Sequence, residues 1–453
     1  MKIAIVGAGI SGLTTAFYVK RARPDWELTI FDAEPVPGGT MYTADVEGFR
    51  FEAGGNGFLS NKPDSQQLVE DAGADHLLLP SSDLARRRFI YKDGLHPLPE
   101  SPPAFLKTKL IGWPAKLRVA MEPLVPRRKK TTPETLQQFG YRRLGKGFTD
   151  VFLDAMVAGI YATTPDKVSV EAAFPLVVAL EREHGGLFRG MLARRKKQAG
   201  PGGILMSFKG GVSALIGHLH EIIDAEWRLG EPVTGVLRQG EQASGGNRGS
   251  RYVLRTPSDT PEFDRVVIAS PSYAAAEMVK DLDAGLGKRI GAIGYSPVAV
   301  VGLGYRQLDR ELPGFGLLTT TSAKLPVLGV LWDSSIFPDR APEGGRILRL
   351  IIGGQRNPEL VDQDEQGLVR TALEGVRATM GLTDDPEVTY VKRWPRGIPS
   401  YAPGHIARVD AIFERLASHR GLYLNSNAYR GIAMNDCVRN GRLLAERIVG
   451  EGG

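Results

Sequence analysis

The sequence contains a single cysteine, Cys437, among its 453 residues, so no disulfide can form within the chain. This scarcity favours a reducing compartment. There is also no uninterrupted apolar stretch of the roughly 18 residues that a membrane-spanning helix requires. The apolar run at residues 3–6 is typical of a buried strand, so we expect no cleavable secretory signal ahead of it. These absences predict a cytoplasmic protein that does not cross a membrane.

Motifs that place catalytic side chains are equally scarce. We find no cluster of metal ligands, no catalytic dyad and no nucleophile elbow. Cys437 has no histidine near it in sequence, so we interpret it as a small helix residue and not as a nucleophile. We therefore expect no bound metal and assign no catalytic side chain.

The net charge of +6 is concentrated in one stretch. Residues 86–130 hold 12 Lys and Arg against three acidic residues, so the rest of the chain is slightly acidic. A basic block can serve nucleic acid, an anionic membrane or an acidic small molecule, and it can equally be a solvated face. No zinc finger, RNA-recognition sheet motif or helix-turn-helix is present, so we do not expect nucleic acid as a partner.

Prolines break the region from residue 101 to 200 into short pieces, yet an apolar helical spacing persists in its first part. The residues at this spacing are Leu106, Leu110, Trp113, Leu117, Met121 and Leu124. Lysines and arginines lie between them. An amphipathic segment of this kind is suited to one leaflet of an anionic membrane, but the same leucines would also serve as core.

The first 32 residues have the pattern of a nucleotide-binding βαβ unit. A strand-like run at 2–6 leads into GAGISG at 7–12, and a helical segment at 13–23 precedes a strand-like run at 27–31. In this fingerprint Gly7 permits the turn, Gly9 lets backbone amides approach a pyrophosphate, and Gly12 lets the helix pack on the strand. Asp32 then lies where a carboxylate can accept hydrogen bonds from ribose hydroxyls. We predict a bound dinucleotide.

Strand-like runs return after residue 206. They lie at 233–237, 252–255 and 266–269, and again at 298–305, 326–331 and 347–352. A last run at 421–425 precedes a helix at about 435–449. The nucleotide-binding fold therefore resumes at later points in the chain, which predicts a discontinuous domain with others inserted.

Two further glycine-rich segments indicate which dinucleotide binds. A double glycine at 38–39 and the loop FEAGGNGF at 51–58, together with NAYRGIAMNDC at 427–437, resemble the flavin amine-oxidase superfamily. The resemblance implies non-covalently bound FAD, with the later loop beside the isoalloxazine and the N-terminus of the last helix meeting the flavin. The cofactor-binding residues that it implies are Gly7, Gly9, Ile10, Ser11, Gly12, Asp32, Ala33, Gly38, Gly39, Gly55, Asn56, Gly57, Val233, Trp394, Ile432, Ala433 and Met434.

Segments inside the chain narrow the resemblance. RFIY at 88–91, SPPAFL at 101–106, DAMVAGIYA at 154–162, AAFP at 172–175, GVLWDSSIFPDR at 329–340 and WPRGIPSY at 394–401 are similar, in family order, to protoporphyrinogen oxidases. The implied fold is α/β + α. It has a discontinuous Rossmann-like FAD domain (1–90, 206–275 and 395–453), a mixed-sheet substrate-binding domain (276–394) and a small helical membrane-binding domain (91–205). The implied location is peripheral, on the inner face of the membrane.

The implied reaction is the six-electron oxidation of protoporphyrinogen IX to protoporphyrin IX in haem biosynthesis. Three hydrides pass to the flavin, which O₂ (giving H₂O₂) or another acceptor reoxidises, so the protein has to supply an apolar slot and a cation for a propionate. By resemblance Arg88 is that cation, and the slot is walled by Gly159, Phe315, Leu318, Leu331 and Ile351. From the residues alone, the four apolar side chains would belong to the hydrophobic core, and Arg88 would face solvent. Gly159 would be a glycine that allows another part of the backbone to approach closely. This interpretation stays open.

Other functions also stay open. Coproporphyrinogen III carries four propionates instead of two, and enzymes of the same family use it; a single slot cation and an apolar lining favour protoporphyrinogen IX. An amine oxidase or desaturase of the superfamily is a second alternative, although we locate no aromatic pair at the flavin face. A flavin-stabilised porphyrin carrier without enzymatic activity is a third. A homodimer is an open assembly state.

Overall fold

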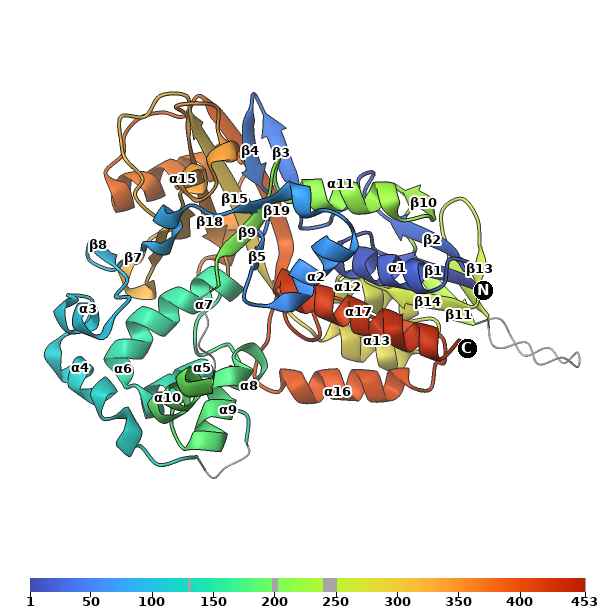
Figure 1. Cartoon of the computed structure of the whole chain (residues 1–453), viewed down its shortest axis with the longest axis horizontal. Helices are drawn as coiled ribbons and strands as arrows, with labels where there is room; N and C mark the ends of the chain where they lie inside the picture. Colours follow the sequence, from blue (N-terminus) through green and yellow to red (C-terminus); the bar gives the residue numbers. More distant parts are fainter. Residues whose placement is uncertain (129–131, 198–202, 239–250, 453) are drawn as a thin grey trace, which may run out of the picture.

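The structure is a computed structural model that describes residues 1–128, 132–197, 203–238 and 251–452. Three regions can be followed in Figure 1. Both chain ends lie in the region on the right, which contains a parallel sheet and its helices. A second sheet with α15 (Glu365–Met380) lies at the upper left, and a group of short helices lies below it. The predicted combination of an α/β fold with a helical part is confirmed.

The parallel sheet is assembled from segments far apart in the sequence. Its strand order is β10-β2-β1-β14-β20, with bounds Glu226–Leu229, Glu27–Asp32, Lys2–Val6, Arg265–Ile268 and Leu422–Leu424. The predicted discontinuity is thereby confirmed. Strand side chains alternate between the two faces, so Ile3 and Ile5 of β1 pack beneath one set of helices while Ala4 and Val6 pack beneath another.

Helices cover both faces of this sheet. On the face of Ile3 and Ile5 lie α1 (Ile10–Ala22), α11 (Ser213–Ile222) and α17 (Met434–Gly450). On the opposite face lie α12 (Ser272–Val279), α13 (Ala284–Gly291) and α16 (His405–Leu416), together with the small sheet of β11 (Gly235–Arg238), β12 (Tyr252–Arg255) and β13 (Glu262–Phe263). This doubly wound arrangement leaves a crevice at the carboxyl ends of the strands.

The second sheet has seven strands and mixed directions. Its order is β19-β15-β18-β17-β16-β7-β8, with bounds Val388–Pro399, Tyr295–Tyr305, Arg346–Gly353, Val327–Leu331, Gly316–Thr319, Arg88–Tyr91 and Leu95–Pro97. All pairs are antiparallel except β7 with β16. One face packs on α15 through residues such as Val330 and Leu350. The other face turns toward α7 (Asp154–Tyr161).

The predicted domain limits at residues 90 and 394 fall inside strands β7 and β19. Strand β7 bonds to β16 along its whole length, and β19 bonds to β15. Cutting either strand would leave backbone groups of the sheet without partners. We propose that the substrate-binding unit includes both strands complete and also β8.

The helical region is held by buried ion pairs. It contains α3 (Pro102–Lys107), α4 (Trp113–Ala120), α5 (Leu136–Arg143), α9 (Pro175–His184) and α10 (Leu187–Lys197). The fully buried guanidinium of Arg143 contacts the equally buried carboxylate of Glu122. Glu122 also accepts the N–H groups of Leu187 at 2.8 Å and Phe188 at 3.2 Å. One carboxylate thus fixes the start of α10 against α5.

A buried arginine of the second sheet fastens a loop that belongs to the first region. Arg349 on β18 pairs with Asp333 at 2.7 Å and donates to the carbonyls of Glu52 (3.2 Å) and Gly54 (2.6 Å). Its guanidinium also contacts the side chain of Asn56. The loop at 52–57, which follows β4 (Phe49–Glu52), is therefore held by a side chain some 290 positions later.

We predict that Arg349→Met lowers the free energy of unfolding by about 3–5 kcal/mol, because it leaves the buried Asp333 carboxylate unpaired. Urea denaturation followed by circular dichroism measures the change. Arg370→Met on the exposed side of α15 is the control and should change stability by no more than about 0.5 kcal/mol. Equal effects of the two substitutions would contradict a special contribution from the buried pair.

Candidate functional site

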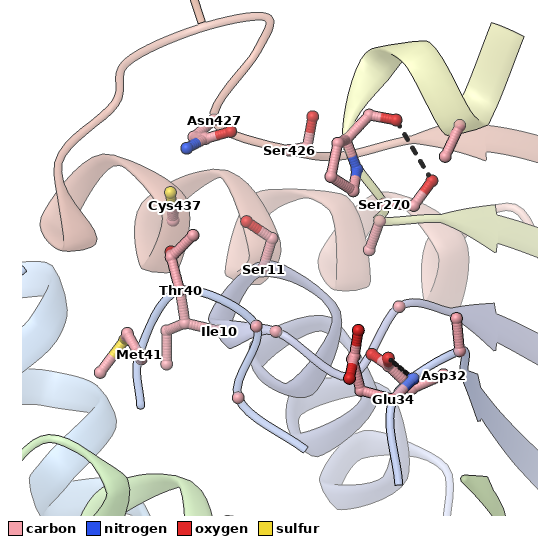
Figure 2. Close-up of a pocket in the computed structure, with 18 of the residues that line it drawn as sticks. Ile10, Ser11, Asp32, Glu34, Thr40, Met41, Ser270, Ser426, Asn427 and Cys437 are labelled. Carbon is pink, nitrogen blue, oxygen red and sulfur yellow. Dashed lines mark hydrogen bonds between the residues drawn. The ribbon is translucent and has the colours of Figure 1, made fainter. Parts of the chain in front are cut away.

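A cleft of about 610 Å³ lies at the carboxyl ends of the parallel strands. Figure 2 shows residues from separate parts of the chain gathered around it, among them Ser11, Asp32, Thr40, Asn427 and Cys437. Most residues predicted to bind the cofactor line this cleft. They are Gly7, Gly9, Ile10, Ser11, Asp32, Ala33, Gly38, Gly39, Gly55, Gly57, Val233, Trp394, Ile432, Ala433 and Met434.

Two of the predicted residues, Gly12 and Asn56, support the wall of the cleft without lining it. A Cβ on Gly12 would come within 1.9 Å of the Gly7 carbonyl oxygen, so glycine is needed for α1 to approach β1. The side-chain oxygen of Asn56 accepts a hydrogen bond from Arg349. Both residues therefore fix the position of glycines that do face the cleft.

Glycines at the cleft leave the space that a dinucleotide needs. A Cβ on Gly9 would meet nothing closer than the Gly38 oxygen at 3.9 Å, and a Cβ on Gly55 would meet nothing within 4 Å. Side chains at these positions would project into the open cleft. Gly7, by contrast, has a φ of 114° and would press a Cβ to 2.9 Å from the Ala269 carbonyl carbon. The residues present therefore fit an extended dinucleotide.

Two helix N-termini face the cleft. Helix α1 begins at Ile10 after the N-cap Gly9 and carries no acidic residue in its first turn. Helix α17 begins at Met434, and Ala433 and Met434 line the cleft. The first N–H groups of a helix have no partner within it and carry partial positive charge, so they can hold a diphosphate or another electron-rich group.

Asp32 at the end of β2 is held ready to accept ribose hydroxyls. Its carboxylate accepts the N–H of Ala8 at 2.7 Å and the N–H of Glu34 at 2.9 Å, a contact drawn in Figure 2. Burial raises the pKa of Asp32 above its ordinary value, and these two bonds oppose the rise. Each oxygen keeps a lone pair for a ligand hydroxyl.

Sequence reasoning missed several lining residues. Ser270, Pro271 and Tyr273 follow β14, and the rule that ligands bind beyond the carboxyl ends of parallel strands could have identified them. Ser426 and Asn427 follow β20 for the same reason. Cys437 on α17 also lines the cleft; burial raises the pKa of its thiol to about 11, so it stays neutral at neutral pH.

The residues predicted to wall the substrate slot lie close together on one side of the second sheet. A Cβ on Gly159 of α7 would come 2.8 Å from a methyl carbon of Leu318 on β16. Leu331 and Phe315 pack on one apolar cluster, and Ile351 packs on a neighbouring cluster that also contacts Trp394. Because Trp394 lines the cofactor cleft, the two sites adjoin.

Arg88 lies at the edge of this group. It is the first residue of β7, directly beside Gly316 of β16, and its side chain is exposed. The guanidinium carbon is 5.2 Å from the centroid of the Phe315 ring. Arg88 forms no ion pair within the described residues, so its charge is available to a ligand over Phe315.

A buried ion pair holds α7 against the sheet. Asp154 accepts the N–H of Thr321 at 2.6 Å and its hydroxyl at 2.8 Å, and pairs with Arg356 at 3.1 Å. Arg356 in turn donates to the carbonyl of Thr319 at 2.8 Å. Burial lowers the pKa of Arg356, while Asp154 opposes the shift. These contacts keep Gly159 over Leu318.

The fold and the dinucleotide cleft define a flavin-dependent oxidoreductase. Residues 10–449 match the family described as flavin containing amine oxidoreductase, and the chain belongs to this family. FAD is therefore its cofactor, and FAD supplies two-electron redox chemistry when bound.

Full-length relatives and solved structures agree with this assignment. The chain is 29% identical to coproporphyrinogen III oxidase of Bacillus subtilis over 97% of its length and 96% of that protein. It is 28% identical to human protoporphyrinogen oxidase, over 99% and 98% of the two chains. A crystal structure from Exiguobacterium sp. 255-15, provisionally named protoporphyrinogen oxidase, superposes with a TM-score of 0.86 at 28% identity over 99% of both chains. A putrescine oxidase at 15% identity and a TM-score of 0.72 shares the fold.

We predict that Asp32→Ala weakens FAD binding by about 1–3 kcal/mol, because charge-assisted hydrogen bonds to the ribose are lost. FAD titration of the apoprotein measures the affinity. Acid precipitation of the purified protein should release FAD into the supernatant, since no covalent link between FAD and the protein is expected. Glu27→Ala at the exposed start of the same strand is the control. Flavin retained on the pellet, or unchanged affinity in Asp32→Ala, would contradict this prediction.

Proposed function

We propose that the chain oxidises a porphyrinogen as an FAD-dependent enzyme of haem biosynthesis. The observation that carries the proposal is a group of apolar side chains with one exposed arginine at its edge, which adjoins the cofactor cleft through Trp394. A porphyrinogen is a flexible, uncharged ring system with propionate side chains, which matches apolar walls and a cation at the rim. The names of the full-length relatives point to the same class of substrate.

Oxidation of a porphyrinogen by a flavin requires the protein's side chains to bind the substrate and does not require a catalytic side chain. Six electrons and six protons leave the macrocycle in three two-electron rounds, and three molecules of O₂ would become three of H₂O₂ when oxygen is the acceptor. Protons can leave from pyrrole nitrogens, so a protein base is not required. Asp154 at the start of α7 and Arg356 form an ion pair with each other, so neither serves as a base. The walls would exclude water, and Arg88 would orient the ring by a propionate.

Within this class we propose protoporphyrinogen IX as the preferred substrate. Arg349 and Arg356, two further arginines near these residues, are each paired with a buried carboxylate and are not available to further propionates. Placing an unpaired carboxylate against Leu318 or Leu331 would cost several kcal/mol. Relatives named for either porphyrinogen match the whole chain at similar identity, so the choice rests on the slot.

We predict that protoporphyrinogen IX gives the higher kcat/KM and bleaches the flavin rapidly under anaerobic conditions. Arg88→Ala should raise KM more than it lowers kcat, because a propionate contact is made equally in ground and transition states. Arg86→Ala is the control, since Arg86 is exposed and contacts Asp83 at 3.3 Å.

A higher kcat/KM for coproporphyrinogen III would overturn the substrate preference while leaving porphyrinogen oxidation intact. If neither porphyrinogen bleaches the flavin, the alternative of a porphyrin carrier without enzymatic activity is favoured. If only polyamines bleach the flavin, the alternative of an amine oxidase is favoured.

We further propose that the helical region rests on an anionic membrane surface at the cytoplasmic side. No helix in the described ranges is long and apolar enough to span a bilayer. A ridge of large apolar side chains nevertheless faces solvent, each between 46% and 75% exposed: Leu106, Trp113, Leu117, Met121 and Leu124. Exposed apolar area of this kind is suited to insertion at the lipid headgroup level.

The charges near this ridge are fewer than the sequence indicates. Lys116 turns inward and donates to the carbonyls of Leu106 (2.7 Å) and Thr108 (2.8 Å), and Arg118 donates to those of Arg142 and Arg143. Lys107 and Lys109 remain exposed. Residues 129–130 of the basic stretch lie outside the described residues. Apolar insertion should therefore contribute more than electrostatic attraction.

We predict that the protein floats with anionic liposomes at low salt and that Trp113→Ser with Leu117→Ser strongly reduces flotation. Both side chains are exposed, so stability should change by no more than about 0.5 kcal/mol. Leu443→Ser, an exposed leucine on α17, is the matched control. A protein that stays in the soluble fraction at low salt would show that the ridge has another role.

A further inference from the structure

The cofactor cleft is poor in positive charge. Three carboxylates line it, those of Asp32, Glu34 and Glu231, while Arg396 is the one lysine or arginine among its lining residues in the described part of the chain. Glu231 is neutralised by Arg228 at 2.7 Å. Asp32 and Glu34 form no ion pair within the described residues. A doubly negative diphosphate therefore enters a cleft that already carries uncompensated negative charge.

Arg396 lies where it can offset this charge. It is on β19, two positions after Trp394, and both side chains line the cleft. The guanidinium carbon is 4.8 Å from the centroid of the Tyr273 ring. The side chain of Arg396 forms no ion pair and no hydrogen bond within the described residues, and it is exposed. Stacking on Tyr273 orders the guanidinium without using its N–H donors.

Tyr273 connects Arg396 to the fingerprint turn. It lies in the first turn of α12, directly after the segment Ala269–Pro271 that follows β14. The backbone of Ala269 and Ser270 packs on Gly7 so closely that a Cβ there would come within 3.0 Å of both. The arginine thus stacks on a residue of the turn whose backbone packs against the glycine loop, and it lines the same cleft as Asp32 and Glu34.

We propose that Arg396 is the counter-cation of the FAD diphosphate and that it, together with the N-terminus of α1, makes the cleft selective for the phosphorylated flavin. Backbone N–H groups alone bring partial charges, whereas the cleft has to balance a dianion beside Asp32 and Glu34. A guanidinium presents its N–H groups to phosphate oxygens in a rigid planar fork, whereas a lysine acts as a point charge.

The test compares three flavins: riboflavin has no phosphate, FMN has one, and FAD has a diphosphate that also carries adenosine. Apoprotein of wild type, Arg396→Ala and Arg396→Lys is titrated with FAD, FMN and riboflavin, and binding is followed by flavin fluorescence. We expect Arg396→Ala to weaken FAD roughly tenfold, the loss of one charge-assisted contact at a partly screened site, and to leave riboflavin unchanged. Arg396→Lys should retain most of the affinity. The FAD affinity of wild type should also fall with added salt more steeply than that of Arg396→Ala.

The matched control is Arg393→Ala. Arg393 is exposed on the same strand and donates to the carbonyl of Gln363, and it does not line the cleft. This substitution should leave all three flavins unaffected.

Unchanged FAD affinity in Arg396→Ala would overturn the proposal. So would an equal loss for FAD and riboflavin, which would place the contact at the ring, or a change in porphyrinogen KM alone, which would assign the arginine to the substrate. The flavin titrations need no substrate turnover, so their outcome stands apart from the proposed oxidase activity.

Discussion

The buried guanidinium of Arg349 is the contact on which the relation between the two sheets depends. It costs a great deal to desolvate, and that cost is offset only because Asp333 and the carbonyls of Glu52 and Gly54 surround it together. The loop that it fastens carries Gly55 and Gly57 to the cofactor cleft, and Ile351, one of the residues proposed to contact the substrate, lies two positions along β18. The cofactor loop and the proposed substrate-contacting residues are thus positioned from one side chain. Redox chemistry at a bound cofactor tolerates little misplacement of the reacting groups, so this common anchor matters for function as well as for stability.

The helical region contributes the residue that packs on Leu318 from the other side. Helix α7 carries Gly159 over Leu318, and the Asp154–Arg356 pair fixes the helix to the end of β16. The carboxylate of Glu122 fixes a neighbouring part of the same region. Buried ion pairs therefore occur where one region has to keep its position against another. Apolar packing alone tolerates sliding, whereas a paired charge permits one arrangement.

Patterns in the sequence predicted those elements well that depend on residues close together in the chain. The glycine fingerprint, Asp32 and the strands at 252–255 and 347–352 all lie within a position or so of their observed bounds. What could not be predicted depends on distant partners. Strand β7 joins the second sheet because Gly316 lies beside Arg88, more than two hundred positions away. Leu110 and Leu117 share one spacing, yet the first is buried and the second exposed, because spacing identifies a face without stating what covers it. Arg349 and Lys116 look like surface residues in the sequence for the same reason.

The order of strands in the parallel sheet also determines when each strand finds its partners during synthesis. Strand β1 meets β2 soon after both are made, but its other edge pairs with β14, which begins at Arg265. At about 5–20 residues per second, the ribosome leaves that apolar edge unpaired for on the order of 10–50 s. An open edge of this kind is a template for wrong pairing with other chains. Flavin binding cannot stabilise the incomplete sheet at this stage, because Ala433 and Met434, which line the cofactor cleft, are synthesised much later. Yield of folded protein should therefore depend on how well nascent chains are shielded, and less on how much flavin the cell contains.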